Sequence, residues 1–133
     1  MSRWVNRGIG FGILWCALWS VSAQDSTWVA YRYADGTISS EGNLVQGRPA
    51  GYWRSFYPNG FRKSEGNWRN GKLEGEWVFY DDQGRLETTL SYSAGLKLGE
   101  EASWDSLGTL RTILPWYNDT LNGIQTNFDS SGI

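Results

Sequence analysis

The sequence contains no histidine and only one cysteine among its 133 residues. Without histidine it lacks the commonest general base, the commonest metal ligand and the usual activator of a catalytic serine or cysteine. A single cysteine excludes an internal disulfide framework and any zinc or iron–sulfur site that needs several cysteines. We therefore expect no enzyme, cofactor or metal site. The length is that of one domain, since domains commonly use about 100–200 residues.

Glycine and tryptophan are abundant instead, with 17 and 9 copies. Tryptophan favours strands, and glycine favours the tight turns that connect them. No segment between the turns shows an amphipathic helical pattern of useful length. The composition therefore indicates an all-β protein with frequent turns.

Residues 1–23 have the pattern of a secretory signal peptide. Arg3 and Arg7 precede an uncharged, mostly apolar run from Gly8 to Val21, and small residues lead to Ala23. This run is shorter than the roughly 18–20 residues that a membrane-spanning helix needs, although a retained anchor is the alternative. Cleavage after Ala23 would leave 110 residues without cysteine, and losing the two arginines would change the net charge from −2 to −4. The pattern predicts a secreted or periplasmic protein of the cell envelope.

The remaining residues, 24–133, contain a repeat with a period of 24 residues, and several columns of the repeat stay in register. One glycine column consists of Gly36, Gly60, Gly84, Gly108 and Gly132. A second consists of Gly51, Gly75, Gly99 and Gly123, and a third of Gly47, Gly71 and Gly95, followed by Asp119. Because several columns agree, we interpret residues 24–133 as one repeat domain.

Each repeat unit has the pattern of a β-hairpin. The aromatic segment Tyr52–Tyr57 predicts a strand, and Pro58-Asn59-Gly60 predicts a type I turn closed by a glycine bulge. Residues 61–68 would form the return strand, and a second turn would run from Asn70 to Gly75. Stacking such hairpins predicts an elongated, single-layer antiparallel sheet of about nine or ten strands, in which neighbouring units stabilise one another.

The segment from Gly51 to Trp77 resembles the MORN-repeat variant family. It contains Gly-Tyr-Trp-Arg-Ser-Phe-Tyr, then Asn-Gly, then Glu-Gly-Asn-Trp. The resemblance extends from about Trp28 to Gly132, but Glu-Gly becomes Leu90-Ser91 and Leu114-Pro115, and Asn-Gly becomes Asn118-Asp119. These departures predict less regular hairpins near the C-terminus. The resemblance implies a stacked-hairpin sheet for protein or membrane contact without catalytic residues, and an antitoxin role by family association.

Aromatic side chains are the candidate binding surface. We single out Trp53, Trp77, Tyr52, Tyr80 and Trp104, because exposed rings can stack on sugars. In a repeat sheet such rings more often stabilise cross-strand pairs, and exposure would distinguish the two roles. The acidic pairs are interpreted as solvated turn and edge residues: Glu74 with Glu76, Asp81 with Asp82, and Glu100 with Glu101.

Nucleic-acid binding is not expected, because it needs a clustered positive surface and the processed chain would be acidic. Membrane contact has only a local basic cluster in its favour, formed by Arg62, Lys63, Arg69 and Lys72. The main hypothesis is an exported, non-catalytic repeat protein that binds a protein or envelope component. A carbohydrate-binding module and an antitoxin component are the alternatives.

Overall fold

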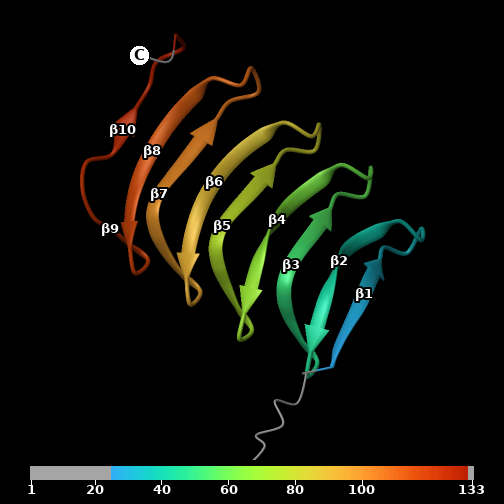
Figure 1. The fold of residues 1–133 in the computed structure, drawn as a ribbon. Helices are drawn as coiled ribbons and strands as arrows, with labels where there is room; N and C mark the ends of the chain where they lie inside the picture. Colours follow the sequence, from blue (N-terminus) through green and yellow to red (C-terminus); the bar gives the residue numbers. More distant parts are fainter. Residues whose placement is uncertain (1–24, 132–133) are drawn as a thin grey trace, which may run out of the picture.

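The computed structural model describes residues 25–131, which form a single open antiparallel sheet without any helix (Figure 1). The predicted signal peptide and Gly132 lie outside the described residues. The strands are β1 (Ser26–Arg32), β2 (Ile38–Val45), β3 (Arg48–Phe56), β4 (Arg62–Arg69), β5 (Lys72–Tyr80), β6 (Leu86–Ser93), β7 (Leu96–Trp104), β8 (Leu110–Tyr117), β9 (Thr120–Leu121) and β10 (Thr126–Asn127). This confirms the predicted all-β sheet of consecutive hairpins.

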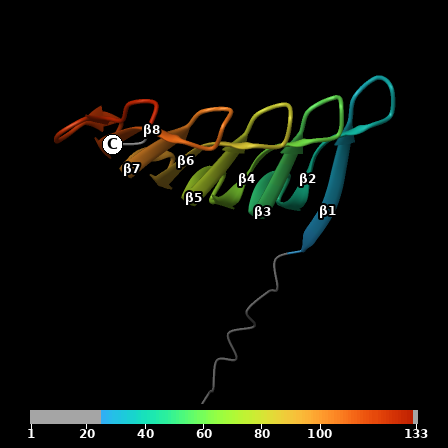
Figure 2. The same cartoon turned by 90° about the horizontal axis from the view of Figure 1, so that it is seen from above.

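Strands β1 to β8 lie in sequence order, and β1 to β7 each pair only with their neighbours along the chain. The short strands β9 and β10 both pair with β8. Seen from above, the sheet is a single layer (Figure 2), and its turns form two rows, at the upper and the lower ends of the strands in Figure 1. Local pairing of this kind gives a ribbon whose stability is a sum over adjacent units.

The turns alternate between two types. At the first edge, Gly60 N donates to Tyr57 O over 2.9 Å and Tyr57 N donates to Phe61 O over 2.8 Å. With Gly60 at φ +89°, this is the predicted type I turn closed by a glycine bulge. The same two bonds recur at the turns that end at Gly36, Gly84 and Gly108.

The second edge is formed by two-residue turns in which both central residues have positive φ, as in type I′ hairpins. These turns are Gln46-Gly47, Asn70-Gly71, Ala94-Gly95 and Asn118-Asp119. The last of them keeps the geometry although Asp119 replaces glycine, with φ +63°. The Asp119 side chain is held by the neighbouring strand β7, because its Oδ1 accepts from Lys97 N over 2.7 Å. The hairpin at Asn118-Asp119 is therefore more regular than the sequence predicted.

The second glycine column has a different role from the one predicted. Gly75 was expected to end the turn before a strand at residue 76, but β5 begins at Lys72 and Gly75 lies inside it with φ +70°. Gly51 in β3 and Gly99 in β7 have the same conformation. Next to each glycine, the register with the preceding strand shifts, whereas pairing with the following strand continues. These residues are therefore bulge glycines that bend the odd-numbered strands.

The fourth member of that column, Gly123, departs from the pattern. Its φ is +129°, and it lies in the loop between β9 and β10. The strand that would follow β8 is consequently broken into two short pieces, β9 and β10. The departure from regularity that the sequence predicted near the C-terminus is found here, and not at the preceding turn.

Candidate functional site

The two faces of the sheet differ in chemistry. We call the side that carries Trp53, Trp77 and Leu90 the tryptophan face, and the side that carries Glu41 and Glu65 the glutamate face. Within the described residues these are the buried side chains, each at most 9% exposed. A single layer therefore has a thin core on each side.

Trp53 and Trp77 occupy equivalent positions and make equivalent contacts. The indole nitrogen of Trp53 donates to Asn43 O over 2.9 Å, and that of Trp77 donates to Asn67 O over 3.1 Å. The Trp53 ring lies against Gly42 and the Trp77 ring against Gly66, and each glycine provides room because it has no side chain. These two tryptophans are 7% and 6% exposed, so they are core residues.

An open row of Trp53, Trp77 and Trp104 is therefore not formed. The Trp53 ring stacks with Tyr31 at 6.3 Å between centroids, and Trp68 meets Trp77 edge-on at 5.9 Å. Trp104 is half-buried and lies in another column, at the end of β7. Ring burial removes the flat surfaces that stacking on a sugar would need.

A hollow with a volume of about 260 Å³ lies on the tryptophan face. Its lining includes the serines Ser40, Ser55 and Ser64 and the tryptophans Trp53, Trp68 and Trp77. The hydroxyls of Ser55 and Ser64 lie 2.7 Å apart and share a hydrogen bond. The hollow combines aromatic edges with hydroxyl groups, which is a chemistry that suits a small neutral polar ligand.

One unit after Gly66 and Trp77, both residues of this glycine–tryptophan contact are replaced. Leu90 stands at the position of Gly66, and Glu101 stands at the position of Trp77. Leu90 is only 4% exposed and lies opposite Trp77, so the larger side chain fills space beside that ring. Glu101 accepts from the indole nitrogen of Trp116 over 2.8 Å and pairs with Lys97 at 3.3 Å. The second half of this face is therefore held by polar contacts.

The glutamate face contains a cluster that the sequence analysis missed. The Glu65 carboxylate accepts from the hydroxyls of Tyr52 and Tyr80, the latter over 2.6 Å, and pairs with Arg62 at 2.8 Å. One unit earlier, Glu41 pairs with Arg54 at 2.6 Å. The available signal was that Glu41 and Glu65 are 24 residues apart, each directly before a glycine. Two members of the proposed aromatic surface, Tyr52 and Tyr80, therefore serve this cluster.

The cluster shifts the ionisation of its members. Burial alone would raise the pKa of Glu65, but hydrogen bonds from Tyr52, Tyr80 and Arg62 outweigh it and hold that pKa below its usual value. Burial and the neighbouring carboxylate raise the pKa of Tyr52 to about 12. The carboxylate is thus kept ionised and both hydroxyls protonated at neutral pH. With every partner matched, this is a structural cluster rather than a general acid or base.

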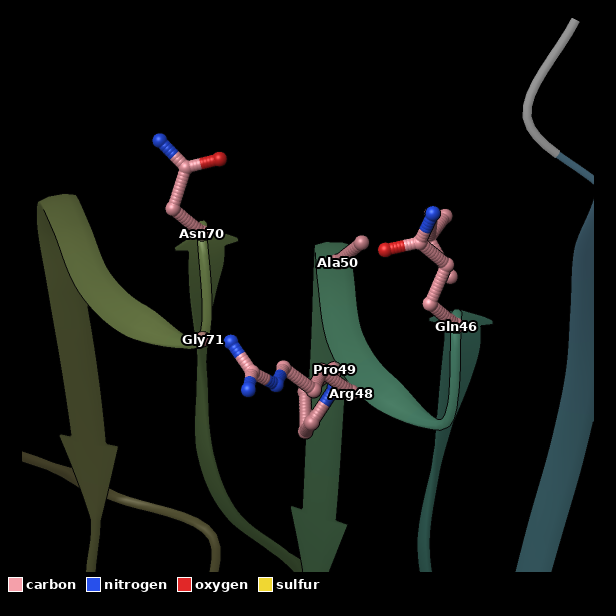
Figure 3. Close-up of a pocket in the computed structure, with 7 residues that line it drawn as sticks. Gln46, Arg48, Pro49, Ala50, Asn70 and Gly71 are labelled. Carbon is pink, nitrogen blue, oxygen red and sulfur yellow. The ribbon is translucent and has the colours of Figure 1, made fainter.

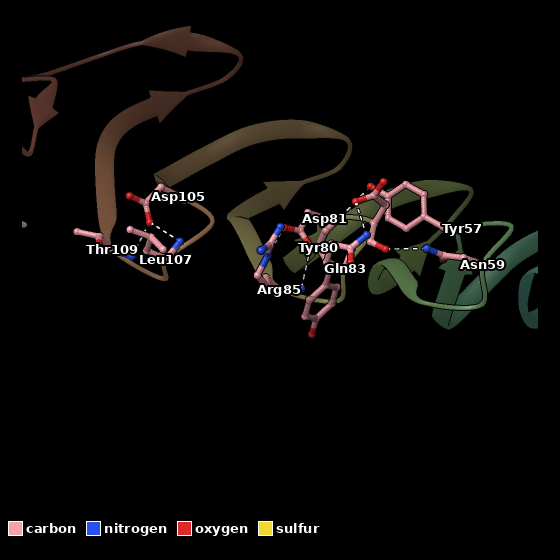
Figure 4. A network of polar contacts seen from close by, with 10 residues as sticks. Tyr57, Asn59, Tyr80, Asp81, Gln83, Arg85, Asp105, Leu107 and Thr109 are labelled. Atoms are coloured by element: carbon pink, nitrogen blue, oxygen red, sulfur yellow. Dashed lines mark hydrogen bonds and ion pairs between the residues drawn. The ribbon is translucent and has the colours of Figure 1, made fainter. Parts of the chain in front are cut away.

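The type I turns are held in two ways (Figure 4). Where the turn begins with tyrosine, its hydroxyl reaches the next unit: Tyr33 donates to Phe56 O over 2.7 Å, and Tyr57 to Tyr80 O over 2.9 Å. Where it begins with aspartate, the carboxylate caps its own turn: Asp81 accepts from the backbone nitrogens of Gln83 and Arg85, and Asp105 from those of Leu107 and Thr109. The acid at Asp81 thus has a turn-capping role.

The second turn edge carries a hollow of about 180 Å³ between the first two type I′ turns. Arg48 extends toward Gly71 in it, and Gln46 and Asn70 lie at its rim (Figure 3). Further along this edge, Glu74 accepts from Ala94 N over 2.9 Å and lies 4.0 Å from Arg69. Glu74 is half-buried in β5, but Arg69 is exposed, and an ion pair with an exposed partner at this distance contributes little to stability.

The basic cluster does not form one free patch. Arg62 is held by Glu65, and Lys63 lies over the ring of Tyr57 at 5.6 Å.

No group of three or more potential metal ligands occurs among residues 25–131. In the same range, the structure has no apolar helix of membrane-spanning length.

Large apolar side chains remain exposed on β7 and β8. Leu98 lies directly opposite Tyr117, and Leu96 is two residues from Leu98 on the same strand face. Their exposed fractions are 37%, 57% and 42%. Leu98 pairs with Ser91, which points away from the side of Leu90, so these residues lie on the glutamate face. We call Leu96, Leu98 and Tyr117 the leucine–tyrosine patch.

A comparison with models of known protein families finds no match, and no curated protein matches the chain. The resemblance to the MORN-repeat variant family therefore stays a prediction. The fold and the chemistry of its surfaces carry the functional argument.

Proposed function

We propose that this chain is an exported, non-catalytic repeat protein that uses its open sheet to bind a protein of the cell envelope. The leucine–tyrosine patch supports the proposal most directly. Isolated exposed apolar residues are normal, but a contiguous group on a rigid strand pair is typical of a contact surface. The proposal draws on the resemblance to MORN-repeat variants for its general class and on residues 1–23 for export.

The patch suits a protein partner with apolar side chains better than it suits a charged polymer. Leucine and tyrosine present apolar area at low entropic cost, because the sheet already fixes their backbones. Glu100 lies two residues from Leu98 on the same strand face, so an anionic polymer would meet a like charge beside the patch. A partner segment with apolar side chains would cover the patch and leave the glutamate cluster unchanged.

A photo-crosslinking experiment tests this function. A photoreactive phenylalanine placed at residue 117 should capture one specific envelope protein, and Leu98→Glu should abolish the crosslink by placing a charge in the apolar contact. Leu107→Glu is the matched control, since Leu107 is 86% exposed at a turn tip away from the patch. Loss of the crosslink in both variants, or in neither, would contradict the proposal. N-terminal sequencing of the exported protein should begin at Gln24.

Carbohydrate binding is the second candidate, favoured by the hollow beside Ser55 and Ser64. Titration with a panel of neutral glycans should quench the fluorescence of Trp68, the half-buried tryptophan in its lining. Ser64→Leu should abolish the quenching by filling the hollow, and an unchanged signal across the panel would dismiss this function. Nothing in residues 25–131 favours the antitoxin alternative, which rests on family association alone.

A further inference from the structure

The first strand of the sheet has an outer edge with no neighbour among residues 25–131, because β1 pairs only with β2. An unpaired strand edge presents backbone donors and acceptors to any other strand. Natural proteins usually protect such edges with lysine, proline or a bulge. Strand β1 reads Ser-Thr-Trp-Val-Ala-Tyr-Arg and contains neither lysine nor proline.

The edge of β1 also lacks the bulge of its equivalents. Strands β3, β5 and β7 carry bulge glycines that interrupt the register on this side, at Gly51, Gly75 and Gly99. The equivalent residue in β1 is Thr27, which is not among the residues with positive φ, so β1 lacks this bulge conformation. Its pairing with β2 is regular from Ser26 to Tyr31. At the other end of the sheet, β9 and β10 are only two residues long, so that edge offers no comparable ladder.

The turn geometry determines which backbone groups face outward. Val45 and Arg48 flank a two-residue turn and form a hydrogen-bonded pair, so the neighbouring Leu44 directs its N–H and C=O toward β1. Leu44 pairs with Thr27, so Thr27, Val29 and Tyr31 use their backbone groups within the sheet. Ser26, Trp28 and Ala30 consequently direct theirs to the free edge.

We propose that two copies of this chain pair through β1, antiparallel about a twofold axis at Val29. In this register the strands overlap over their full length, and Trp28 lies opposite Ala30 of the other copy, so a large side chain meets a small one. Val29 faces Val29 on the tryptophan face, and Thr27 faces Tyr31. The pairing covers Trp28 and Tyr31, which are 56% and 51% exposed. It buries no unpaired charge, because Arg32 lies opposite Ser26.

A second copy fits this edge better than a head-to-tail neighbour does. Strand β10 is antiparallel to β8 and therefore runs in the same direction as β1. Adding the β10 end of one copy to β1 of the next would place parallel strands side by side. Antiparallel pairing of β1 with itself closes the assembly as a dimer and keeps both sheet faces continuous. The β1 pair would therefore double the length of the ribbon.

Sedimentation of the protein isolated from cells that express the full chain tests the assembly. A concentration-dependent dimer is expected, and Ala30→Pro should weaken it at least about tenfold, because proline removes an outward N–H without breaking the β1–β2 ladder. Trp28→Lys should act in the same direction by charging the edge. Leu107→Lys is the control, because this residue is 86% exposed at a turn tip away from β1, and it should leave the dimer unchanged.

A crosslink tests the register. In a Cys16→Ser background, Val29→Cys should form an intermolecular disulfide, since a non-hydrogen-bonded pair brings the two Cα atoms to about 4.5 Å. Trp28→Cys should not, because its copies would lie about 8 Å apart, beyond disulfide reach. The proposal would be overturned if the protein were monomeric at every concentration. That includes the case of a monomer whose own residues 1–24 occupied the edge. A dimer that Ala30→Pro leaves intact, or that crosslinks equally at both positions, would also overturn it.

Discussion

The indole ring of Trp77 rests on Gly66 so closely that a Cβ at the glycine would lie 2.4 Å from ring atom Cδ2. Real Cβ atoms do not approach other atoms so closely, and the neighbour is a buried ring that cannot swing away. The same arrangement holds one unit earlier between Trp53 and Gly42. The pair of an open glycine and a flat ring is thus the basic packing element of the tryptophan face.

The first prediction follows from this contact. Gly66→Ala should lower the free energy of unfolding by about 1–3 kcal/mol, because an added methyl group overpacks a fitted site. Urea denaturation measures the change. In the Trp77→Ala background the same substitution should cost much less, because the ring that it would strike is gone. If the two effects are additive, the clash is not the cause.

The second prediction concerns the Glu65 cluster. Glu65→Gln should reduce stability at pH 7 by about 1–3 kcal/mol, since Tyr52, Tyr80 and Arg62 would lose a buried charged partner. The pKa of Glu65 is lower in the folded state than its ordinary value of 4.5, so its contribution is present above that value and disappears as the pH falls through the folded pKa. The free energy of unfolding, measured by denaturation at several pH values between 7 and 2, should therefore depend less on pH in the variant.

Tyr52 gives the same cluster an alkaline limit. Its folded pKa of about 12 exceeds the ordinary value of 10, so the protonated hydroxyl stabilises the fold below pH 10 and this contribution is lost as the pH rises toward 12. Tyr52→Phe should weaken that alkaline dependence. Glu76→Gln, at an exposed position of the next strand, is the control and should leave both limits unchanged.

A third prediction concerns the type I′ turns. Ala94 has φ +48°, a conformation that costs an L-residue with a side chain roughly 1 kcal/mol. Ala94→Gly should therefore raise the melting temperature, while its backbone bond to Glu74 is retained. Ala102→Gly within β7 should lower it, because glycine weakens a regular strand. Destabilisation by both substitutions would show that turn strain is not limiting.

A fourth prediction addresses contacts between successive units. Tyr57→Phe removes the hydroxyl that donates to Tyr80 O and should lower stability by about 1 kcal/mol. Hydrogen exchange should show the loss at the type I turns on either side of the contact rather than across the sheet. Tyr117→Phe, which removes a hydroxyl from an exposed ring, should have no comparable effect.

The sequence determined the repeat and the hairpins, because a 24-residue period and turn residues such as Pro58-Asn59-Gly60 are local signals. The type I turn at Gly60 was predicted in full, because its backbone preference needs no distant partner. The turn at Asn70 was predicted to start where it does but to run on to Gly75, whereas it has two residues. The position of Gly75 inside β5 could not be predicted, because a bulge depends on the register with the neighbouring strand.

Burial and exposure were decided only by the tertiary structure. The sequence left open whether Trp53 and Trp77 are exposed binding rings or packed rings. Each ring lies against a glycine 11 residues earlier, Gly42 or Gly66, and this places both rings in the core. The Glu65 cluster likewise collects side chains from three strands that no local pattern links. Local sequence specifies strands and turns, whereas the register across the sheet specifies which side chains meet and which edge is left open.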